Sequence, residues 1–274
     1  MDQLFQALVM GVVQGLTEFL PISSSGHLLL VPYLFGWDDP FIDSLAFSVV
    51  LHGGTLLALL IYFRDDWLRL IPAGLATIRD RSFRGDPDRR LAWLLVVSTI
   101  PAAIAGALLN DFIEANVRQP GLVALMLVVA GVLLWLGDRW GARIHAIERL
   151  SFRGALGIGL AQTIALIPGT SRSGISITAA LFAGLDRTAA VRYSFLMAMP
   201  VIAGAVAFEG FKLVRGEVSN VELGPLVVGI VAAFVSGMIA IEVLLRYVRT
   251  RSFNIFVIYR FVLAAIVLAV FLTR

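Results

Sequence analysis

The chain contains no cysteine and few charged residues, and each shortage excludes a class of protein. Without cysteine there is no disulfide, thiolate metal site or cysteine nucleophile, and three histidines make a zinc cluster unexpected. Only 15% of the 274 residues are charged, whereas 59% are apolar and the mean hydropathy is +0.89. Soluble domains carry roughly 25% charged residues. We therefore expect a membrane protein and, despite a pI of 9.7, no nucleic-acid partner.

Long apolar runs predict an all-α, polytopic membrane protein that forms one integral membrane domain. About twenty helical residues cover the roughly 30 Å of hydrocarbon in a bilayer. Six runs are long enough to cross: 41–63, 91–109, 119–136, 190–214, 224–246 and 254–272. Two further apolar pairs are interrupted by Pro, Ser and Gly: 3–20 with 27–35, and 154–167 with 175–184. The arms of the second pair are too short to span, which favours a re-entrant helix–loop–helix.

Arginine placement predicts the orientation of the chain and the nature of the first interrupted pair. No Lys or Arg precedes Arg64. Most of the 22 basic residues fall in four loops: 64–90, 137–153, 185–192 and 246–251. The positive-inside rule assigns these loops to the cytoplasm, so the span 41–63 begins outside and the first pair has to be re-entrant. The opposite loops, which include Arg118 and Glu217, hold few basic residues, and both termini are expected on the outer face.

The two halves of the chain share one organisation. Residues 1–136 and 154–274 each hold one re-entrant pair and three spans, with 137–153 as a cytoplasmic connector. Because three is an odd number, the second half has to be inverted relative to the first. A register shift of 148 residues aligns Gly11 with Gly159, Gln14 with Gln162, Ser23 with Ser171, Ser25 with Ser173 and Gly26 with Gly174. Inverted repeats with broken helices place a site near the bilayer midplane, where the loops meet.

Both re-entrant loops carry side chains suited to an anionic, phosphate-like group. The first loop offers Gln14, Glu18, Ser23, Ser24, Ser25, Gly26 and His27, and the second offers Gly169, Thr170, Ser171, Arg172, Ser173 and Gly174. Serine hydroxyls cap helix N-termini, whose dipole favours anions, and a guanidinium binds phosphate bidentately. Ser and Gly also serve close helix packing in membranes. An ionisable group at mid-bilayer costs about 2.5–3.5 kcal/mol, so Glu18 and Arg172 are functional candidates.

Other polar residues of the apolar segments carry plainer expectations. A functional role is favoured for His27 as well, although it lies about one turn from the outer surface, where solvent alone could account for it. His52 lies in the middle of a span, within His-Gly-Gly-Thr, and we expect packing rather than ligand contact there. Three more residues fall near predicted span ends and are expected at the membrane interface: Glu209, Glu242 and Arg260.

The two loops resemble the signatures of the undecaprenyl-diphosphate phosphatase family, the bacitracin-resistance type. The first signature is Glu/Gln-x-x-x-Glu running into Pro-x-Ser-Ser-Thr/Ser-Gly-His, which residues 14–27 match. The second is Pro-Gly-x-Ser-Arg-Ser-Gly, which residues 168–174 match fully. The resemblance covers essentially the whole chain. Gln14 stands where some relatives have Glu, so no second carboxylate is carried over, and nothing is carried over to His52.

This resemblance implies an enzyme of the bacterial inner membrane that removes the terminal phosphate from a C55 polyprenyl diphosphate. Such an activity recycles the lipid carrier for peptidoglycan synthesis and confers bacitracin resistance, because it depletes the lipid that the antibiotic binds. It implies a site open to the periplasmic face, with Ser24 as nucleophile and Glu18, His27 and Arg172 as further catalytic residues. The residues expected to contact the substrate are Gln14, Ser23, Ser25, Gly169, Thr170, Ser171, Ser173 and Gly174.

Two mechanisms and a second class of function stay open. Ser24 could attack phosphorus with Glu18 or His27 as base, or Glu18 could activate water directly, as a ligand of Mg²⁺ or Ca²⁺. No organic cofactor is expected; the expected partners are the lipid substrate and membrane lipid, and an oligomer is compatible. The alternative function is a polyprenyl-phosphate flippase or other transporter, because inverted repeats with broken helices are typical of carriers. A flippase would release no phosphate.

Overall fold

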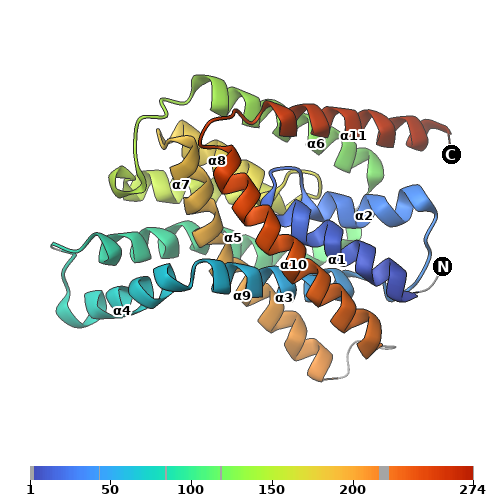
Figure 1. Cartoon of the computed structure of the whole chain (residues 1–274), viewed down its shortest axis with the longest axis horizontal. Coiled ribbons are helices and arrows are strands. Elements are labelled where there is room, and N and C mark those ends of the chain that lie inside the picture. Colours follow the sequence, from blue (N-terminus) through green and yellow to red (C-terminus); the bar gives the residue numbers. More distant parts are fainter. Residues whose placement is uncertain (1–2, 43, 84, 118, 216–221, 274) are drawn as a thin grey trace.

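The computed structural model describes residues 3–42, 44–83, 85–117, 119–215 and 222–273, which form helices and no strand (Figure 1). The α-helices are α1 (Gln3–Phe19), α2 (Ser24–Phe35), α3 (Leu45–Tyr62), α4 (Arg64–Asp80), α5 (Pro87–Asn116), α6 (Pro120–Trp140), α7 (Phe152–Thr163), α8 (Arg172–Phe182), α9 (Arg187–Val214), α10 (Leu223–Tyr247) and α11 (Asn254–Thr273). Two short 3₁₀ turns lie at Ile147–Arg149 and Ile164–Leu166. The prediction of an all-α polytopic membrane protein is confirmed.

Five helices of the described chain are long and apolar enough to cross a membrane: α5, α6, α9, α10 and α11. The remaining expected span, 41–63, corresponds to α3, which passes the same test only together with α4, and these two helices meet at 82°. The two chain ends lie at one end of the molecule, opposite α4 (Figure 1). The orientation in the membrane stays a prediction. Arg84, Arg118 and Glu217, which entered that prediction, lie outside the described residues.

The segment 64–90 is not the loop that its charge suggested. Most of it forms α4, and α5 begins at Pro87, where the Asp86 carboxylate caps the helix N-terminus. Helix α4 packs along α5 and buries Leu70. Its other face exposes Leu68, Ile71, Leu75 and Ile78. The prediction was wrong because these apolar residues recur at helical spacing between the arginines, a pattern typical of an amphipathic helix.

Both interrupted apolar pairs form two short helices with a break between them. Ser23 and Ser171 precede α2 and α8 in the same way, with positive φ angles of 78° and 73°. Each hydroxyl accepts a hydrogen bond from the backbone N–H three residues on, at Gly26 or Gly174. Packing is paired as well, because α1 packs on α10 and α7 on α5, while α3 contacts α9 and α6 contacts α11. These correspondences agree with an internal repeat, whose inversion relative to the membrane stays a prediction.

Glycines let the first helix of each pair approach a spanning helix closely. A Cβ atom added at Gly15 of α1 would lie 2.0 Å from the Ser236 hydroxyl of α10, and one at Gly11 would lie 2.3 Å from the Gly229 carbonyl. The corresponding Gly159 of α7 lies equally close to α5, with 2.4 Å between its added Cβ and the Ser98 carbonyl. This small-residue packing is typical of membrane helices. It holds the two loops in a defined position.

Candidate active site

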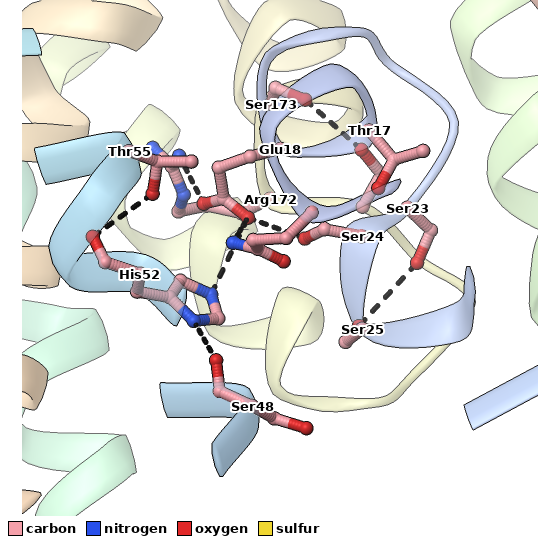
Figure 2. Close-up of polar contacts among 12 residues, drawn as sticks. Thr17, Glu18, Ser23, Ser24, Ser25, Ser48, His52, Thr55, Arg172 and Ser173 are labelled. Carbon is pink, nitrogen blue, oxygen red and sulfur yellow. Dashed lines mark hydrogen bonds and ion pairs between the residues drawn. The ribbon is translucent and has the colours of Figure 1, made fainter. Parts of the chain in front are cut away.

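Glu18, near the end of α1, is the carboxylate around which the site is arranged (Figure 2). Its side chain is only 4% exposed. Its Oε1 accepts a hydrogen bond from Arg172 Nη2 at 2.8 Å. Its Oε2 accepts one from the Ser24 hydroxyl at 2.5 Å and one from Gln14 Nε2 at 3.1 Å. The structure therefore brings four of the expected site residues together, and the ion pair to Arg172 joins the two loops.

His52 of α3 is a fifth member of this group that the sequence analysis did not expect. Its Nε2 lies 3.4 Å from Glu18 Oε2, and its Nδ1 lies 2.7 Å from the Ser48 carbonyl oxygen (Figure 2). A carbonyl only accepts, so Nδ1 is the donor there, and a hydrogen bond from Nε2 to the carboxylate requires the charged ring. Gly54 lets α3 pack closely on α10, because a Cβ there would lie 2.3 Å from the Ile230 carbonyl. The available signal was a histidine in the middle of an apolar run.

Arg260 of α11 was expected at a span end, but that expectation is wrong: the residue is 0% exposed. Its Nε donates to the Pro21 carbonyl at 2.5 Å, and Nη1 and Nη2 both donate to the Thr170 carbonyl at 3.1 Å. One guanidinium thus satisfies carbonyl groups in both loops. Irregular backbone at membrane depth has to find such partners within the protein. Arg260 therefore holds the two loops in register without contacting Glu18.

Serines from each loop also contact the opposite loop. The Ser23 hydroxyl accepts a hydrogen bond from the Gly169 N–H at 3.1 Å, and the Ser173 hydroxyl donates to the Leu20 carbonyl at 3.2 Å. Ser23 is fully buried, and Ser173 is 1% exposed. The Ser25 hydroxyl lies 3.5 Å from that of Ser23. The geometry therefore gives Ser23 and Ser173 a structural role at the loop junction in addition to any substrate contact.

His27 contacts other partners than Ser24. Its Nδ1 lies 2.7 Å from the Ser23 carbonyl oxygen, and its Nε2 lies 2.7 Å from the Tyr259 hydroxyl, on which the ring also stacks at a centroid distance of 5.6 Å. Because the carbonyl only accepts, Nδ1 donates, and in the neutral ring Nε2 accepts from the tyrosine. Of the two bases considered for Ser24, Glu18 is therefore the one beside the hydroxyl.

Three polar side-chain atoms of the site are buried without a hydrogen-bond partner among the described residues: Gln14 Oε1, Thr170 Oγ1 and Arg172 Nη1. Buried polar groups are paired in the great majority of native structures, so unpaired ones point to a bound molecule. Arg172 is the most informative, because Nη2 holds Glu18 while Nη1 stays available. A guanidinium nitrogen close to the N-termini of α2 and α8 suits a phosphate oxygen.

Glu18, the expected metal ligand, has few possible partner ligands among the described residues. In the part of the chain that the structure describes, no group of three or more His, Asp or Glu side chains could hold a metal ion. Glu18 already pairs with Arg172 at 2.8 Å, and a second cation on this carboxylate would face the guanidinium charge.

Glu242 and Glu209 were the two other residues expected at the membrane interface. Glu242 contacts Tyr62 and Arg246, and its side chain is 39% exposed, in agreement with an interface residue. The side chain of Glu209 lies outside the described residues.

Comparison with known proteins gives full-length matches. The family model described as "Bacitracin resistance protein BacA" matches residues 7–266. A relative named undecaprenyl-diphosphatase from Gemmatimonas aurantiaca is 47% identical over 270 residues, which cover 98% of each chain. Relatives with the same name from Desulforudis audaxviator and Geobacter sulfurreducens are each 45% identical, over 98% and 99% of both chains. The similarity therefore includes both loops and the helices that hold them.

Proposed function

Because this chain belongs to the BacA family of bacitracin resistance proteins, we propose that it hydrolyses undecaprenyl diphosphate to undecaprenyl phosphate and inorganic phosphate. The observation that carries the proposal is the Glu18 carboxylate, which bonds to the Ser24 hydroxyl and to Arg172 at the junction of the two loops. A hydroxyl, a base and a guanidinium with one available nitrogen are the groups that phosphoryl transfer requires. The full-length relatives are named undecaprenyl-diphosphatase, which supports undecaprenyl diphosphate as the substrate.

In the proposed first step, the Ser24 oxygen attacks the terminal phosphorus while its proton passes to Glu18, 2.5 Å away. The bond from this phosphorus to the bridging oxygen breaks, and its electron pair stays on the bridging oxygen of the departing undecaprenyl phosphate. Arg172 Nη1 and the N–H groups at the start of α8 stabilise the charge on the transferring group. Water then attacks the phosphoserine, and inorganic phosphate leaves as Ser24 recovers its proton.

The competing mechanism has no covalent intermediate. Glu18 takes a proton from water, the hydroxide attacks the terminal phosphorus directly, and the same bridging bond breaks. Ser24 then serves only as a hydrogen-bond donor to Glu18. The short Ser24–Glu18 contact supports the serine mechanism, because a base has to reach the proton it removes.

We also propose that the site opens to the periplasmic face and that the activity recycles the carrier for peptidoglycan synthesis. The orientation rests on the positive-inside rule applied to the arginine-rich segments of the chain. The prenyl tail would need lateral access from the bilayer, and the diphosphate would need a polar site such as the one around Glu18. Depletion of the diphosphate lipid would also confer bacitracin resistance.

A requirement for Mg²⁺ or Ca²⁺ stays a prediction, with the cation bound mainly by the substrate. Glu18 is paired with Arg172, and no group of three or more His, Asp or Glu among the described residues could hold a metal ion, so a cation would take most of its ligands from the diphosphate oxygens. Such an ion would neutralise charge on the substrate. The steps above use only the side chains of the protein.

The test is phosphate release from undecaprenyl diphosphate in detergent micelles. Native protein is compared with Glu18→Gln and Arg172→Lys, and the exposed Glu148→Gln and Arg153→Lys serve as matched controls. We expect losses of roughly 100-fold or more in the two site variants and less than twofold in the controls. Well-folded native protein that releases no phosphate, with or without Mg²⁺ or Ca²⁺, would overturn the proposal and favour a flippase.

The serine mechanism has its own test. A phosphoserine at position 24, trapped by rapid acid quench and located by mass spectrometry, is the expected intermediate. Ser24→Ala should abolish release, whereas Ser25→Ala should lower it modestly because Ser25 lies beside Ser23 and does not touch Glu18 in the contacts described above. A fully active Ser24→Ala protein would exclude the covalent mechanism and leave direct attack by water.

A further inference from the structure

The arginine-rich end of the molecule holds a cavity of about 520 Å³ that the proposed reaction does not use. It lies where α6 ends, α9 begins and α10 ends, and its charged lining residues are Arg143, Asp186, Arg187 and Arg249. Asp138 pairs with Arg187 at 2.6 Å and lies 3.9 Å from Arg143. The Asp186 carboxylate accepts the Ala189 N–H at the start of α9. Three guanidinium groups therefore face two carboxylates, which leaves the cavity positively charged.

A second cavity, of about 410 Å³, lies between α6 and α11 and is mainly apolar. Its lining residues are Val132, Trp135, Asn254, Val257, Ile258 and Phe261. Ile258 is 62% exposed and Trp135 is 43% exposed, so this groove faces the surroundings of the helices rather than the protein core. On membrane-spanning helices those surroundings are lipid chains.

The same two chain segments line both cavities in the same order. Helix α6 lines the apolar groove with Trp135 and reaches the basic cavity just beyond its end, at Arg143. Arg249, in the connection from α10 to α11, lines the basic cavity, and Asn254, the first residue of α11, lines the groove. Asp138 joins these segments, because its carboxylate also accepts the Phe253 N–H at 3.1 Å. The two cavities are thus consecutive along α6.

Two tryptophans lie near the boundary between the apolar groove and the basic cavity. The rings of Trp135 and Trp140 lie 6.5 Å apart, and Trp140 is 69% exposed. Tryptophan is enriched at the level of lipid headgroups. This places the basic cavity at headgroup depth and the apolar groove among the lipid chains.

We infer that the basic cavity and the apolar groove together form a binding site for an anionic phospholipid of the arginine-rich, cytoplasmic side. Its phosphate would contact Arg143, Arg187 and Arg249, and one acyl chain would lie in the groove along α6 and α11. Basic pockets between transmembrane helices on the cytoplasmic side are suited to anionic headgroups, and arginine matches phosphate geometry. This site shares none of its lining residues with the Glu18 site, so it does not depend on the proposed catalysis.

The test is native mass spectrometry of the full chain, released from detergent, with phosphatidylglycerol or phosphatidylethanolamine added. The pocket variant Arg143→Ala/Arg249→Ala is compared with Arg64→Ala/Arg79→Ala, which removes the same charge from the exposed face of α4. Near a membrane surface each arginine is worth about fivefold in affinity for anionic lipid. We expect roughly 25-fold weaker phosphatidylglycerol binding in the pocket variant and less than twofold in the control. The single variant Arg249→Glu, at an exposed position, guards against misfolding and should also weaken binding by more than fivefold.

Three results would overturn the inference. Equal weakening in the pocket variant and the control would show general attraction to a basic surface. Equal binding of both lipids by native protein would show that the headgroup charge is not recognised. Displacement of phosphatidylglycerol by inorganic phosphate, with the same dependence on Arg143 and Arg249, would assign the cavity to a free anion instead of a lipid.

Discussion

Replacement of Arg260 by lysine tests whether the register of the two loops controls turnover. The guanidinium bonds to the Pro21 carbonyl of one loop and, through two nitrogens, to the Thr170 carbonyl of the other. Lysine keeps the charge, but its single ammonium lacks the planar fork that reaches both sides. A lost hydrogen bond to a charged group costs about 1.5–3 kcal/mol. If that cost falls on the transition state, kcat/KM decreases about 10- to 150-fold.

The assay is phosphate release per folded protein, with kcat and KM determined separately. We expect kcat to carry most of the loss, because Arg260 touches the loops rather than Glu18. Arg251→Lys at an exposed position is the control and should change neither constant by more than twofold. Thermal unfolding of each variant separates loss of fold from loss of loop register. Native turnover in a stably folded Arg260→Lys protein would refute this reasoning.

Three further predictions concern packing, the unexpected histidine and the metal. Gly15→Ala would place a Cβ 2.0 Å from the Ser236 hydroxyl and should destabilise the fold by about 1–3 kcal/mol. Gly53→Ala is the control and should not destabilise the fold, because no heavy atom of another helix lies within 4 Å of the Cβ added there. Equal unfolding midpoints of the two variants would contradict this prediction. His52→Gln should lower kcat about tenfold through loss of its contact with Glu18, and unchanged kcat would exclude that role. A chelator should reduce phosphate release, and added Mg²⁺ or Ca²⁺ should restore it. Calorimetry without substrate should detect no tight binding of either cation. Tight binding would show that the protein forms the metal site alone.

Local pattern was sufficient for much of the fold and for the first members of the site. Apolar runs of adequate length predicted α5, α6, α9, α10 and α11, and the interruptions by Pro, Ser and Gly predicted both helix breaks. Capping by Ser23 and Ser171 followed from their place before apolar segments. The spacing of Gln14 and Glu18 put them on one helical face, where they form a hydrogen bond. Each of these features depends on residues close together in the chain.

Charge alone was a poor guide where it competed with periodicity. The arginines of 64–90 suggested a loop, yet apolar residues recur through that segment at helical spacing and form α4. The positive-inside rule counts basic residues and takes no account of whether the residues between them form an amphipathic helix. Hydropathy along the chain therefore identified the spans better than it identified the structure between them.

The sequence by itself determined which segments span the membrane, where the two interrupted pairs break and which side chains the two loops offer. Only the tertiary structure decided that Arg260, some 240 positions from the first loop, is buried against both loops, and that His52 reaches Glu18. Helix formation depends on neighbouring residues and on the match to the bilayer, both of which can be judged along the chain. The convergence of distant side chains depends on which helix faces pack together and how closely, and glycines such as Gly15 and Gly54 set that distance only once the partner helix is in place.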